Sequence, residues 1–491
     1  MNLQDIITIA FERIGEFLDE ILHAIIGKKT TLDADFTRAS KLISARYKGF
    51  SVTGKKHLSV KQSQNNMLIV SPSGGGKSTA IIYPSIFNIG LSAKKKGVSM
   101  LINDPSGELI KTKNFLLTQG MKVKVLDFTN KYGSIYYNPL HRIKTNADVT
   151  KISNMLVRTT SKQQDFWALK AAELIALCIH HLRETESRVH QNLANVFKIL
   201  ETLQGEPEII DSYFADTTPK HLWRKFLSIM GNSENTRASI ISSAQASLAF
   251  IGDDEILSDI TSVDTFNFDE FREENTVVFL RCSLSDMAYY STILSIFFEQ
   301  FFAHVFRELP KKEDNNVFVI IDELSSLHLP NLANIISNSR KFNCPFLGVL
   351  QSENQLSQNY GEYNAKTILN NANTKIYFTG LSDESKAISD TLGDFDYQDE
   401  KGIVRKRNLM TRDEVRTMRK DKVIVIPSGM RPMLCKIFPY YKQPRLVRYM
   451  EMEAPKDYEE LSLDYSVQYL DFDKYRKPKQ VSDQNTQEDE I

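Results

Sequence analysis

The stretch MLIVSPSGGGKST occupies residues 67–79 and decides the fold class of this chain. Four apolar residues lead into a glycine-rich turn, then Lys77 and Ser78, and then residues 80–83, which can continue as a helix. A strand, a glycine-rich turn and a helix in this order cradle the phosphates of a nucleotide. Glycines let backbone N–H groups approach the phosphate oxygens, and the helix start adds the positive end of its dipole. The stretch therefore predicts that the chain binds ATP or GTP.

The positions of this loop have separate expected roles. The residues expected to bind the nucleotide are Ser73, Gly74, Gly75, Gly76, Lys77, Ser78 and Thr79. Lys77 would reach the β- and γ-phosphates, and the Ser78 hydroxyl would take a coordination position on Mg²⁺. The usual pattern opens with glycine, whereas this chain has Ser71 there. A glycine-rich turn with an exposed lysine is the alternative interpretation.

A second element, VFVII at residues 317–321, ends in Asp322 and Glu323. A continuous apolar, β-rich run is typical of a strand buried on both faces of a parallel sheet. Carboxylates that follow such a strand lie at the edge where α/β folds bind ligands. We expect Asp322 to hold Mg²⁺ and Glu323 to polarise the attacking water. An ordinary surface Asp-Glu pair is the alternative, but the two elements occur together in the order typical of an ATPase.

Length and composition are those of a globular protein with more than one domain. The chain has 491 residues, of which 42% are hydrophobic and 25% charged, and its net charge is +0. No overall field therefore favours nucleic acid or a membrane, although a local patch could. The four cysteines form no CxxC pair, which indicates a reducing compartment. Since the sequence has neither a bilayer-spanning apolar run nor a secretory signal, we expect a cytoplasmic location.

The rest of the sequence predicts an α/β fold with a mostly parallel sheet and an inserted all-α domain. Strands are expected at 67–70, 98–102, 123–126, 277–280, 317–321, 346–350, 375–378 and 423–426. Strand signals are almost absent between residues 126 and 277, where helices are expected at 166–182, 192–203 and 237–250. We therefore expect a nucleotide-binding domain of residues 29–145 and 266–450, and an all-α domain of residues 146–265.

The two ends of the chain have patterns of their own. Residues 1–28 predict an amphipathic helix with an apolar stripe at Ile7, Phe11, Ile14, Leu18, Ile21 and Ile25. This helix would pack on its own domain or dock to a partner, and the pattern does not separate these alternatives. Residues 451–491 are polar and acidic and are expected to be disordered. They would act as a solubilising tail or as a recruitment peptide anchored by Tyr465, Tyr469 and Phe472.

Further motifs follow the phosphate loop in a fixed order. They are YPS at 83–85, NDPSGEL at 103–109, YNPL at 137–140, IDEL at 321–324, NSRK at 338–341, LQS at 350–352, YG at 360–361, ILNN at 368–371, IS at 388–389 with LG at 392–393, and LMTRDEVR at 409–416. The series resembles that of the coupling-protein ATPases of type IV secretion and conjugation systems, the TraG/TraD type, from about residue 37 to residue 440.

This resemblance implies a RecA/FtsK-like motor that uses ATP and Mg²⁺ and assembles as a homo-hexamer. It implies that the motor passes single-stranded DNA, a relaxase–DNA complex or a protein substrate to components of a type IV secretion channel. The helical insertion corresponds to the all-α domain of the family, which helps to select the substrate.

The sequence departs from the family pattern at two places. Members commonly begin with two membrane-spanning helices, and this sequence contains none. Either the chain is a soluble form, or a small membrane protein recruits it through residues 1–28, which would place it peripherally at the inner side of the bacterial cell membrane. Ser106 takes the place of a family lysine, which removes a positive charge near the nucleotide.

Two more site residues follow from the resemblance. Gln351 would end the strand beside Asp322 and Glu323, where its amide would contact the attacking water or the γ-phosphate, or would merely cap a loop. Arg340 is the candidate for an arginine that a neighbouring subunit supplies to the transition state, and an exposed helix arginine is the alternative. The densest basic clusters, at 94–96 and 401–407, are candidates for DNA contact, although charge runs are usually solvated loops.

The predicted function is ATP hydrolysis that drives the transfer of recruited DNA or protein through a type IV secretion channel. A DNA-pumping ATPase of the FtsK/HerA sort is the alternative within the enzyme class. The alternative outside that class is a docking platform, which would bind nucleotide with little turnover and no stimulation by DNA.

Overall fold

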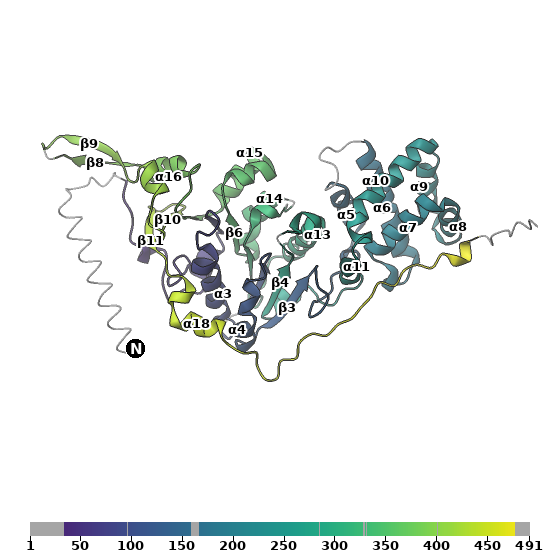
Figure 1. Ribbon diagram of the computed structural model, residues 1–491, viewed down its shortest axis with the longest axis horizontal. Coiled ribbons are helices and arrows are strands. Elements are labelled where there is room, and N and C mark those ends of the chain that lie inside the picture. Colours follow the sequence, from purple (N-terminus) through teal and green to yellow (C-terminus); the bar gives the residue numbers. More distant parts are fainter. Residues whose placement is uncertain are drawn as a thin grey trace, which may run out of the picture.

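The computed structural model describes residues 34–95, 97–158, 166–283, 285–327, 329, 331–399 and 401–476. The helix predicted over residues 1–28 and the end of the acidic tail, 477–491, lie outside these ranges. Within the described part, a nine-stranded sheet forms the centre of an elongated molecule and a group of helices forms one end (Figure 1). None of the helices described there has the length and apolar character that a bilayer crossing requires.

All eight predicted strands form, and all lie in the nine-stranded sheet. In sheet order the strands are β11 (Met433–Lys436), β10 (Lys422–Pro427), β7 (Thr374–Tyr377), β1 (Met67–Val70), β6 (Phe346–Leu350), β5 (Asn316–Ile321), β2 (Val98–Asn103), β4 (Thr276–Arg281) and β3 (Lys122–Asp127). The seven strands from β7 to β3 run parallel, while β10 is antiparallel to both β7 and β11. The expected mostly parallel α/β sheet is therefore confirmed.

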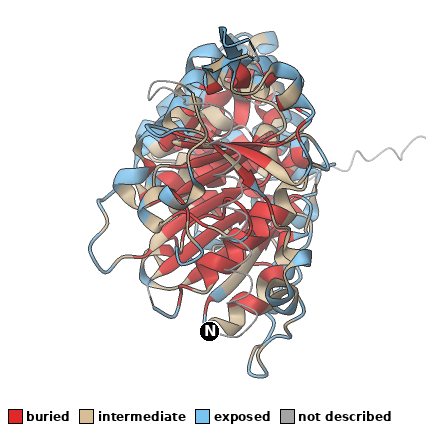
Figure 2. Cartoon of the chain, turned by 90° about the vertical axis from the view of Figure 1, so that its left-hand side faces the viewer, coloured by how far each residue is buried: buried red, intermediate tan, exposed pale blue. Residues whose placement is uncertain are grey.

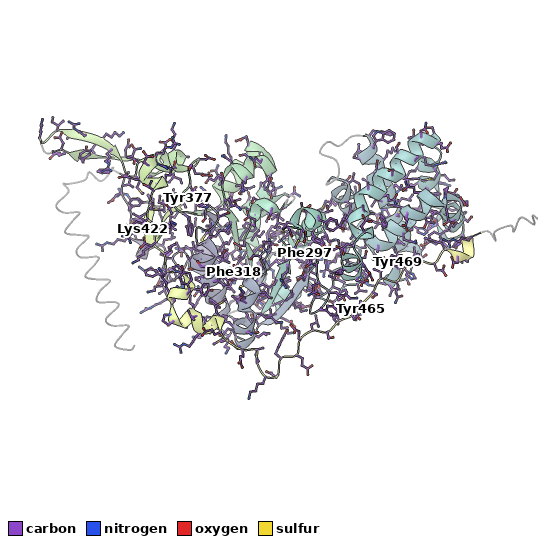
Figure 3. The ribbon with its side chains drawn as sticks, viewed as in Figure 1. Phe297, Phe318, Tyr377, Lys422, Tyr465 and Tyr469 are labelled. Carbon is purple, nitrogen blue, oxygen red and sulfur yellow. The ribbon has the colours of Figure 1, made fainter. Side chains whose placement is uncertain are left out.

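The central strands are buried on both faces, as their continuous apolar runs predict. Along β5, Phe318 and Ile320 belong to one hydrophobic cluster, whereas Val319 belongs to the cluster on the opposite face. Figure 2 shows the buried strands stacked through the middle of the molecule, and Figure 3 labels Phe318 and Phe297, one residue from each of the two clusters. Burying each such side chain stabilises the fold by about 1.5–3 kcal/mol.

Helices cover both faces of the sheet and its carboxyl edge. The helices that accompany the sheet are α2 (Val60–Ser63), α3 (Tyr83–Gly90), α4 (Lys113–Thr118), α12 (Glu270–Glu273), α13 (Met287–Val305), α14 (Leu332–Asn338), α15 (Asn354–Asn371, interrupted at Gly361), α16 (Ser385–Leu392), α17 (Arg412–Arg416) and α18 (Pro444–Met450). Tyr449 of α18 packs on Phe87 of α3 and Phe115 of α4, with ring centroids 5.6 Å and 4.5 Å apart.

The segment between β3 and β4 is helical. Its helices are α5 (Asn146–Arg158), α6 (Phe166–Thr185), α7 (Leu193–Gly205), α8 (Pro207–Thr217), α9 (Lys220–Met230), α10 (Glu234–Gly252) and α11 (Glu255–Ile260). The three helices predicted at 166–182, 192–203 and 237–250 are confirmed as α6, α7 and α10. We refer to these seven helices as the helical region, and the domain limits at 146 and 265 remain a prediction.

After α18 the chain becomes extended instead of leaving the molecule. Residues 451–476, which we call the strap, pass beneath the sheet and along the helical region to the short 3₁₀ turn η9 (Asp473–Tyr475) (Figure 1). Leu470 and Phe472 of the strap are buried. The expectation of disorder from residue 451 onward therefore differs from the structure over 451–476, because backbone contacts that composition does not reveal hold this segment.

A β-hairpin of β8 (Asp394–Gln398) and β9 (Val404–Asn408) projects beside α16 (Figure 1). It contains the basic cluster at 401–407. Three cations of this cluster form ion pairs at 2.6–2.9 Å, namely Arg405 with Asp399, Lys406 with Asp394 and Arg407 with Glu414. The hairpin is therefore less cationic toward solvent than the sequence alone indicates.

Candidate nucleotide-binding site

The phosphate loop begins where β1 ends. The backbone N–H of Ser71 donates to the carbonyl of Leu350 at 3.0 Å, which fixes the loop against the end of β6. Gly74 and Gly76 have φ of 71° and 87°, a region that side chains with a Cβ disfavour. The chain then enters a π-helical turn, η2 (Ser78–Ile82), that continues as α3. The predicted strand–turn–helix order is therefore confirmed.

Sheet order brings the distant site residues together. Because β6 lies between β1 and β5, the residues after these three strands meet at one edge of the sheet. Lys77 Nζ lies 3.6 Å from Glu323 Oε2, and the Ser78 hydroxyl donates to Asp322 Oδ1 at 3.3 Å. The Gln351 amide donates to Glu323 Oε2 at 3.2 Å. The edge thus carries a lysine, a hydroxyl, two carboxylates and an amide within contact distance of one another.

Asp322 has an unusual electrostatic environment. Burial, aided by the nearby Asp104 and Glu323, raises the pKa of this carboxyl to about 6, although Lys77 and the Ser78 hydrogen bond act in the opposite direction. A buried carboxylate next to a hydroxyl suits a divalent cation, whose charge compensates for the lost hydration. Ser78 and Asp322 are therefore the residues that would hold Mg²⁺.

An open cleft in front of the loop has room for a ligand. Its volume is about 500 Å³, and it is lined by the loop, by the residues after β5 and β6, and by α15. The lining residues include Ser73, Gly74, Lys77, Glu323 and Gln351. A Cβ on Gly74 would meet no atom within 4 Å, so the backbone faces free space there. The phosphate loop, the Lys77 ammonium group and the carboxylates therefore fit a nucleotide with bound Mg²⁺.

Ser71 fills the space that the usual opening glycine leaves free, and this makes Gly75 essential. A Cβ on Gly75 would lie 2.3 Å from Ser71 Oγ and 3.1 Å from the Pro72 carbonyl oxygen. Gly75→Ala should therefore weaken ATP binding at least about tenfold by displacing the backbone of the loop. Isothermal titration calorimetry of the full chain checks this.

The second-site variant Ser71→Gly makes the test specific. Ser71→Gly alone should bind ATP like the wild type, and Ser71→Gly combined with Gly75→Ala should recover part of the lost affinity. If the double variant binds no better than Gly75→Ala alone, the contact between residues 71 and 75 is not the cause.

Arg340 is not brought to this cleft within one chain. It lies in the 3₁₀ turn η7 (Ser339–Phe342), before β6 begins, whereas Gln351 follows the end of that strand. Its side chain is exposed. Only a neighbouring subunit could bring Arg340 to a nucleotide, so its role stays a prediction.

Sequence reasoning missed the guanidinium that stands near Ser106. Arg281, which ends β4, lies over Gly107, where an added Cβ would come within 2.9 Å of its Nη2. Its Nη1 pairs with Asp127 at 3.1 Å, and its charge lowers the pKa of the buried Asp104, which burial raises. The positive charge lost at Ser106 is therefore present on a different strand, which only the order β2–β4–β3 reveals.

Asp104 itself organises the loop that follows β2. Its two carboxylate oxygens accept backbone N–H bonds from Glu108 at 3.0 Å and Ile110 at 2.8 Å. Since β2 and β5 pair in register, Asp104 lies beside Asp322 at the same edge. The motif at residues 103–109 could have singled out Asp104 from the sequence, but its hydrogen-bond partners are known only from the structure.

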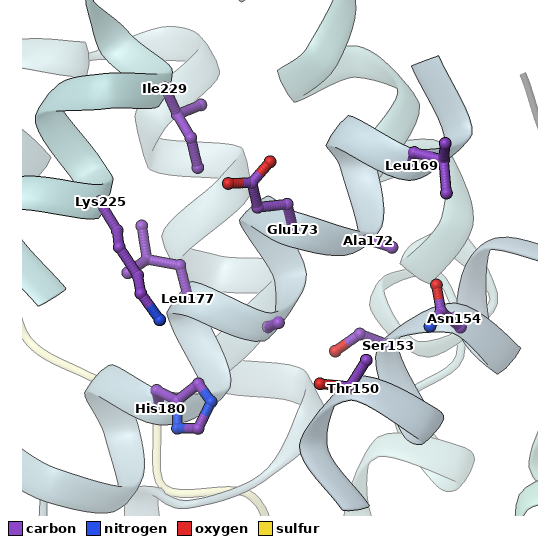
Figure 4. Close-up of a pocket in the computed structure, with 11 residues that line it drawn as sticks. Thr150, Ser153, Asn154, Leu169, Ala172, Glu173, Leu177, His180, Lys225 and Ile229 are labelled. Carbon is purple, nitrogen blue, oxygen red and sulfur yellow. The ribbon is translucent and has the colours of Figure 1, made fainter. Parts of the chain in front are cut away.

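Two other hollows lie away from this edge. One of about 580 Å³ lies at the junction of the helical region with α13 and contains Arg142, Asp264 and His304. The other, of about 280 Å³, lies among α5, α6 and α9, and Glu173, His180 and Lys225 line it (Figure 4). Neither contains a phosphate loop, so the nucleotide site is assigned to the cleft beside Lys77.

Comparison with known proteins identifies the family. A family model described as type IV secretory system conjugative DNA transfer matches residues 17–465. The chain belongs to this family. VirD4 of Rhizobium rhizogenes is 21% identical over 425 residues, which cover 79% of this chain and 60% of VirD4. TraG of Agrobacterium fabrum is 23% identical over 472 residues, which cover 84% of this chain and 66% of TraG. The chain thus spans 60–66% of the length of these two relatives of the conjugative DNA transfer family.

Solved structures agree with the family assignment at the level of the fold. The bacterial conjugative coupling protein TrwB has a TM-score of 0.65 at 17% identity, covering 84% of this chain and 95% of that chain. TrwB in complex with ADP and Mg²⁺ gives a TM-score of 0.63. The resemblance that the motifs indicated and the RecA-like P-loop fold are therefore both confirmed for this member of the conjugative DNA transfer family.

Proposed function

We propose that this chain is an ATP-hydrolysing coupling protein, which recruits conjugative DNA or protein substrates to a type IV secretion channel and drives their transfer. One observation supports this most directly. In a chain of the conjugative DNA transfer family, Lys77, Ser78, Asp322, Glu323 and Gln351 meet at one edge of the sheet. ATP and Mg²⁺ are the proposed cofactors, which the ADP–Mg²⁺ complex of the similar TrwB supports.

The side chains of the site divide the work of hydrolysis. Ser78 and Asp322 would hold Mg²⁺, which would supply positive charge to neutralise the phosphates. Lys77 exchanges its partner Glu323 for the β- and γ-phosphates. This exchange removes the lysine cation from Oε2 of Glu323, which can then accept a proton from the attacking water. Gln351 keeps Glu323 oriented through its amide, and Ser325 donates a hydroxyl hydrogen bond to the other carboxylate oxygen.

The other proposed partners follow from the family. The substrate is single-stranded DNA bound to a relaxase, or a protein, and the acceptor is the secretion channel. A homo-hexamer would place Arg340 of one subunit at the nucleotide of the next. A small membrane protein that binds residues 1–28 would hold the ring at the inner side of the cell membrane.

A non-motor docking platform is the second candidate. The ion pair between Lys77 and Glu323 favours it, because this contact occupies both catalytic groups until nucleotide separates them. A general DNA pump of the FtsK/HerA sort is less favoured, since the family model covers most of the chain.

Transfer in cells tests the proposed function. Donor cells that lack this gene receive the wild-type chain, Lys77→Ala or, as a matched control, the exposed Lys366→Ala. We expect the Lys77 variant to lower transfer frequency at least about 100-fold at equal protein level, because the γ-phosphate loses its cation. The Lys366 variant should transfer normally. Wild-type frequency with Lys77→Ala would refute an ATP-driven role.

A further inference from the structure

The strap is held by a groove that the helical region and the loop before it form. The side chains that build this strap groove are Lys131, Tyr136, Asn195, Glu206, Tyr213, Asp216 and Asp259. They come from the loop after β3, from α7, from α8 and the residue before it, and from α11. Figure 3 labels Tyr465 and Tyr469, which lie along this groove.

Buried side chains of the groove bind the backbone of the strap. The Asn195 amide donates to the Gln468 carbonyl at 2.9 Å and accepts from the Leu470 N–H at 2.8 Å. Asp259 accepts from the Val467 N–H at 2.9 Å. Both Asn195 and Asp259 are buried. Contacts to backbone atoms fix an extended chain whatever its side chains are, as in other modes of peptide recognition.

Two apolar side chains supply the specific anchors. Leu470 and Phe472, two residues apart, are buried, and the Phe472 ring lies 5.1 Å from that of Tyr213. By contrast, every residue from 451 to 469 is exposed or half-buried. The buried side chains of the strap are thus confined to one short stretch, whereas its other contacts, such as that of Glu460 with Lys113 at 2.9 Å, lie at the surface.

The two ends of the groove form ion pairs of opposite sign with the strap. At one end Lys131 pairs with Asp464 at 3.0 Å, and it also pairs with Asp259 of the groove at 3.3 Å. At the other end Glu206 pairs with Arg476 at 3.2 Å, and Asp216 accepts the Tyr475 hydroxyl at 2.7 Å. The groove therefore selects a direction as well as a pattern. The segment that fits has an acidic residue first, then two apolar residues two positions apart, then a basic residue.

We propose that the strap groove is a binding site for an extended peptide segment of a partner protein with this pattern, and that residues 464–476 occupy the site in cis until such a segment replaces them. Replacement, rather than simple release, is favoured because Asn195 and Asp259 would lose buried hydrogen bonds if the groove emptied. The site lies in the helical region, so this inference does not depend on nucleotide hydrolysis.

A labelled synthetic peptide of residues 462–476 tests the proposal by fluorescence anisotropy. The full chain is compared with the same chain carrying Leu470→Asp and Phe472→Asp, which releases the strap. The tethered strap competes at high effective concentration, so the released chain should bind the peptide at least about tenfold more tightly. A scrambled peptide should not bind.

Groove variants locate the binding. In the released chain, Asn195→Ala should weaken binding at least about tenfold, because two backbone contacts are lost, whereas the exposed Glu201→Ala on the same helix should not. Glu206→Lys should weaken binding of the natural peptide, and a peptide with Arg476→Glu should restore it. If Asn195→Ala does not fold, this exchange of charges still shows whether the peptide binds in the strap groove. Equal binding by the intact and released chains, or equal binding of the scrambled peptide, would overturn the proposal.

Discussion

Glu323→Gln is expected to lower ATP turnover by at least about 100-fold, the usual contribution of a general base, while ATP still binds. Glutamine retains the shape of glutamate and can still accept a hydrogen bond from Ser325, but it cannot take a proton from water. It also removes the charge that holds Lys77 at 3.6 Å. Lys77 would then be free for the phosphates, so affinity should stay the same or rise.

Single-turnover hydrolysis and equilibrium ATP binding separate these two effects. The matched control is Glu362→Gln, an exposed carboxylate on α15 that should leave both quantities unchanged. Lys77→Ala should instead lower the affinity for ATP, so that hydrolysis is lost because ATP no longer binds. A Glu323→Gln chain that hydrolyses ATP at the wild-type rate would remove Glu323 from the role of base.

Asp322→Asn is expected to stabilise the nucleotide-free protein while abolishing Mg²⁺-dependent nucleotide binding. Burial raises the pKa of Asp322 from 3.8 to about 6. Above pH 6 the folded protein therefore carries a charge that its interior disfavours, at a cost of about 2–3 kcal/mol. Asparagine is uncharged and avoids this cost, but it is a poor ligand for Mg²⁺.

The pH dependence gives the sign of this effect. Between pH 4 and 6 the folded chain keeps a proton on Asp322 that the unfolded chain has lost, so wild-type stability falls as pH rises through this window. The gain from Asp322→Asn should be small near pH 4 and complete above pH 6. Thermal unfolding at pH 5 and 7.5, with the exposed Asp383→Asn as control, measures it. A variant that is less stable than the wild type at pH 7.5 would contradict this account.

The central sheet could be predicted because its strands are short, continuous apolar runs. Such runs are typical of strands that are buried on both faces of a parallel sheet. β11 was missed because Met433–Lys436 is a short edge strand with mixed polarity. The hairpin of β8 and β9 was missed because Val404–Asn408 is exposed throughout and lacks hydrophobic alternation. Periodicity reports burial, so strands that bury little leave no signal.

The candidate site likewise contains residues that the sequence predicts and residues that only the structure reveals. Lys77, Ser78, Asp322 and Glu323 were predictable because they belong to local motifs. Asp322 and Glu323 directly follow β5, and Lys77 and Ser78 follow β1 after the glycine-rich turn. Arg281 was not, because its proximity to Gly107 depends on the lateral order of β2 and β4. The strap was predicted as disordered because its composition is polar and acidic. The sequence does not reveal the hydrogen bonds that hold it, since Asn195 and Asp259 bind its backbone atoms.

Steady-state ATP hydrolysis by the purified full chain, with and without single-stranded DNA, tests the proposed motor most directly. The Lys77→Ala variant measures any background hydrolysis that does not depend on this site. We expect Mg²⁺-dependent turnover that DNA increases and that the Lys77 variant lacks. ATP binding that depends on Lys77, with no turnover even when DNA is present, would contradict a DNA-driven ATPase and support a docking platform.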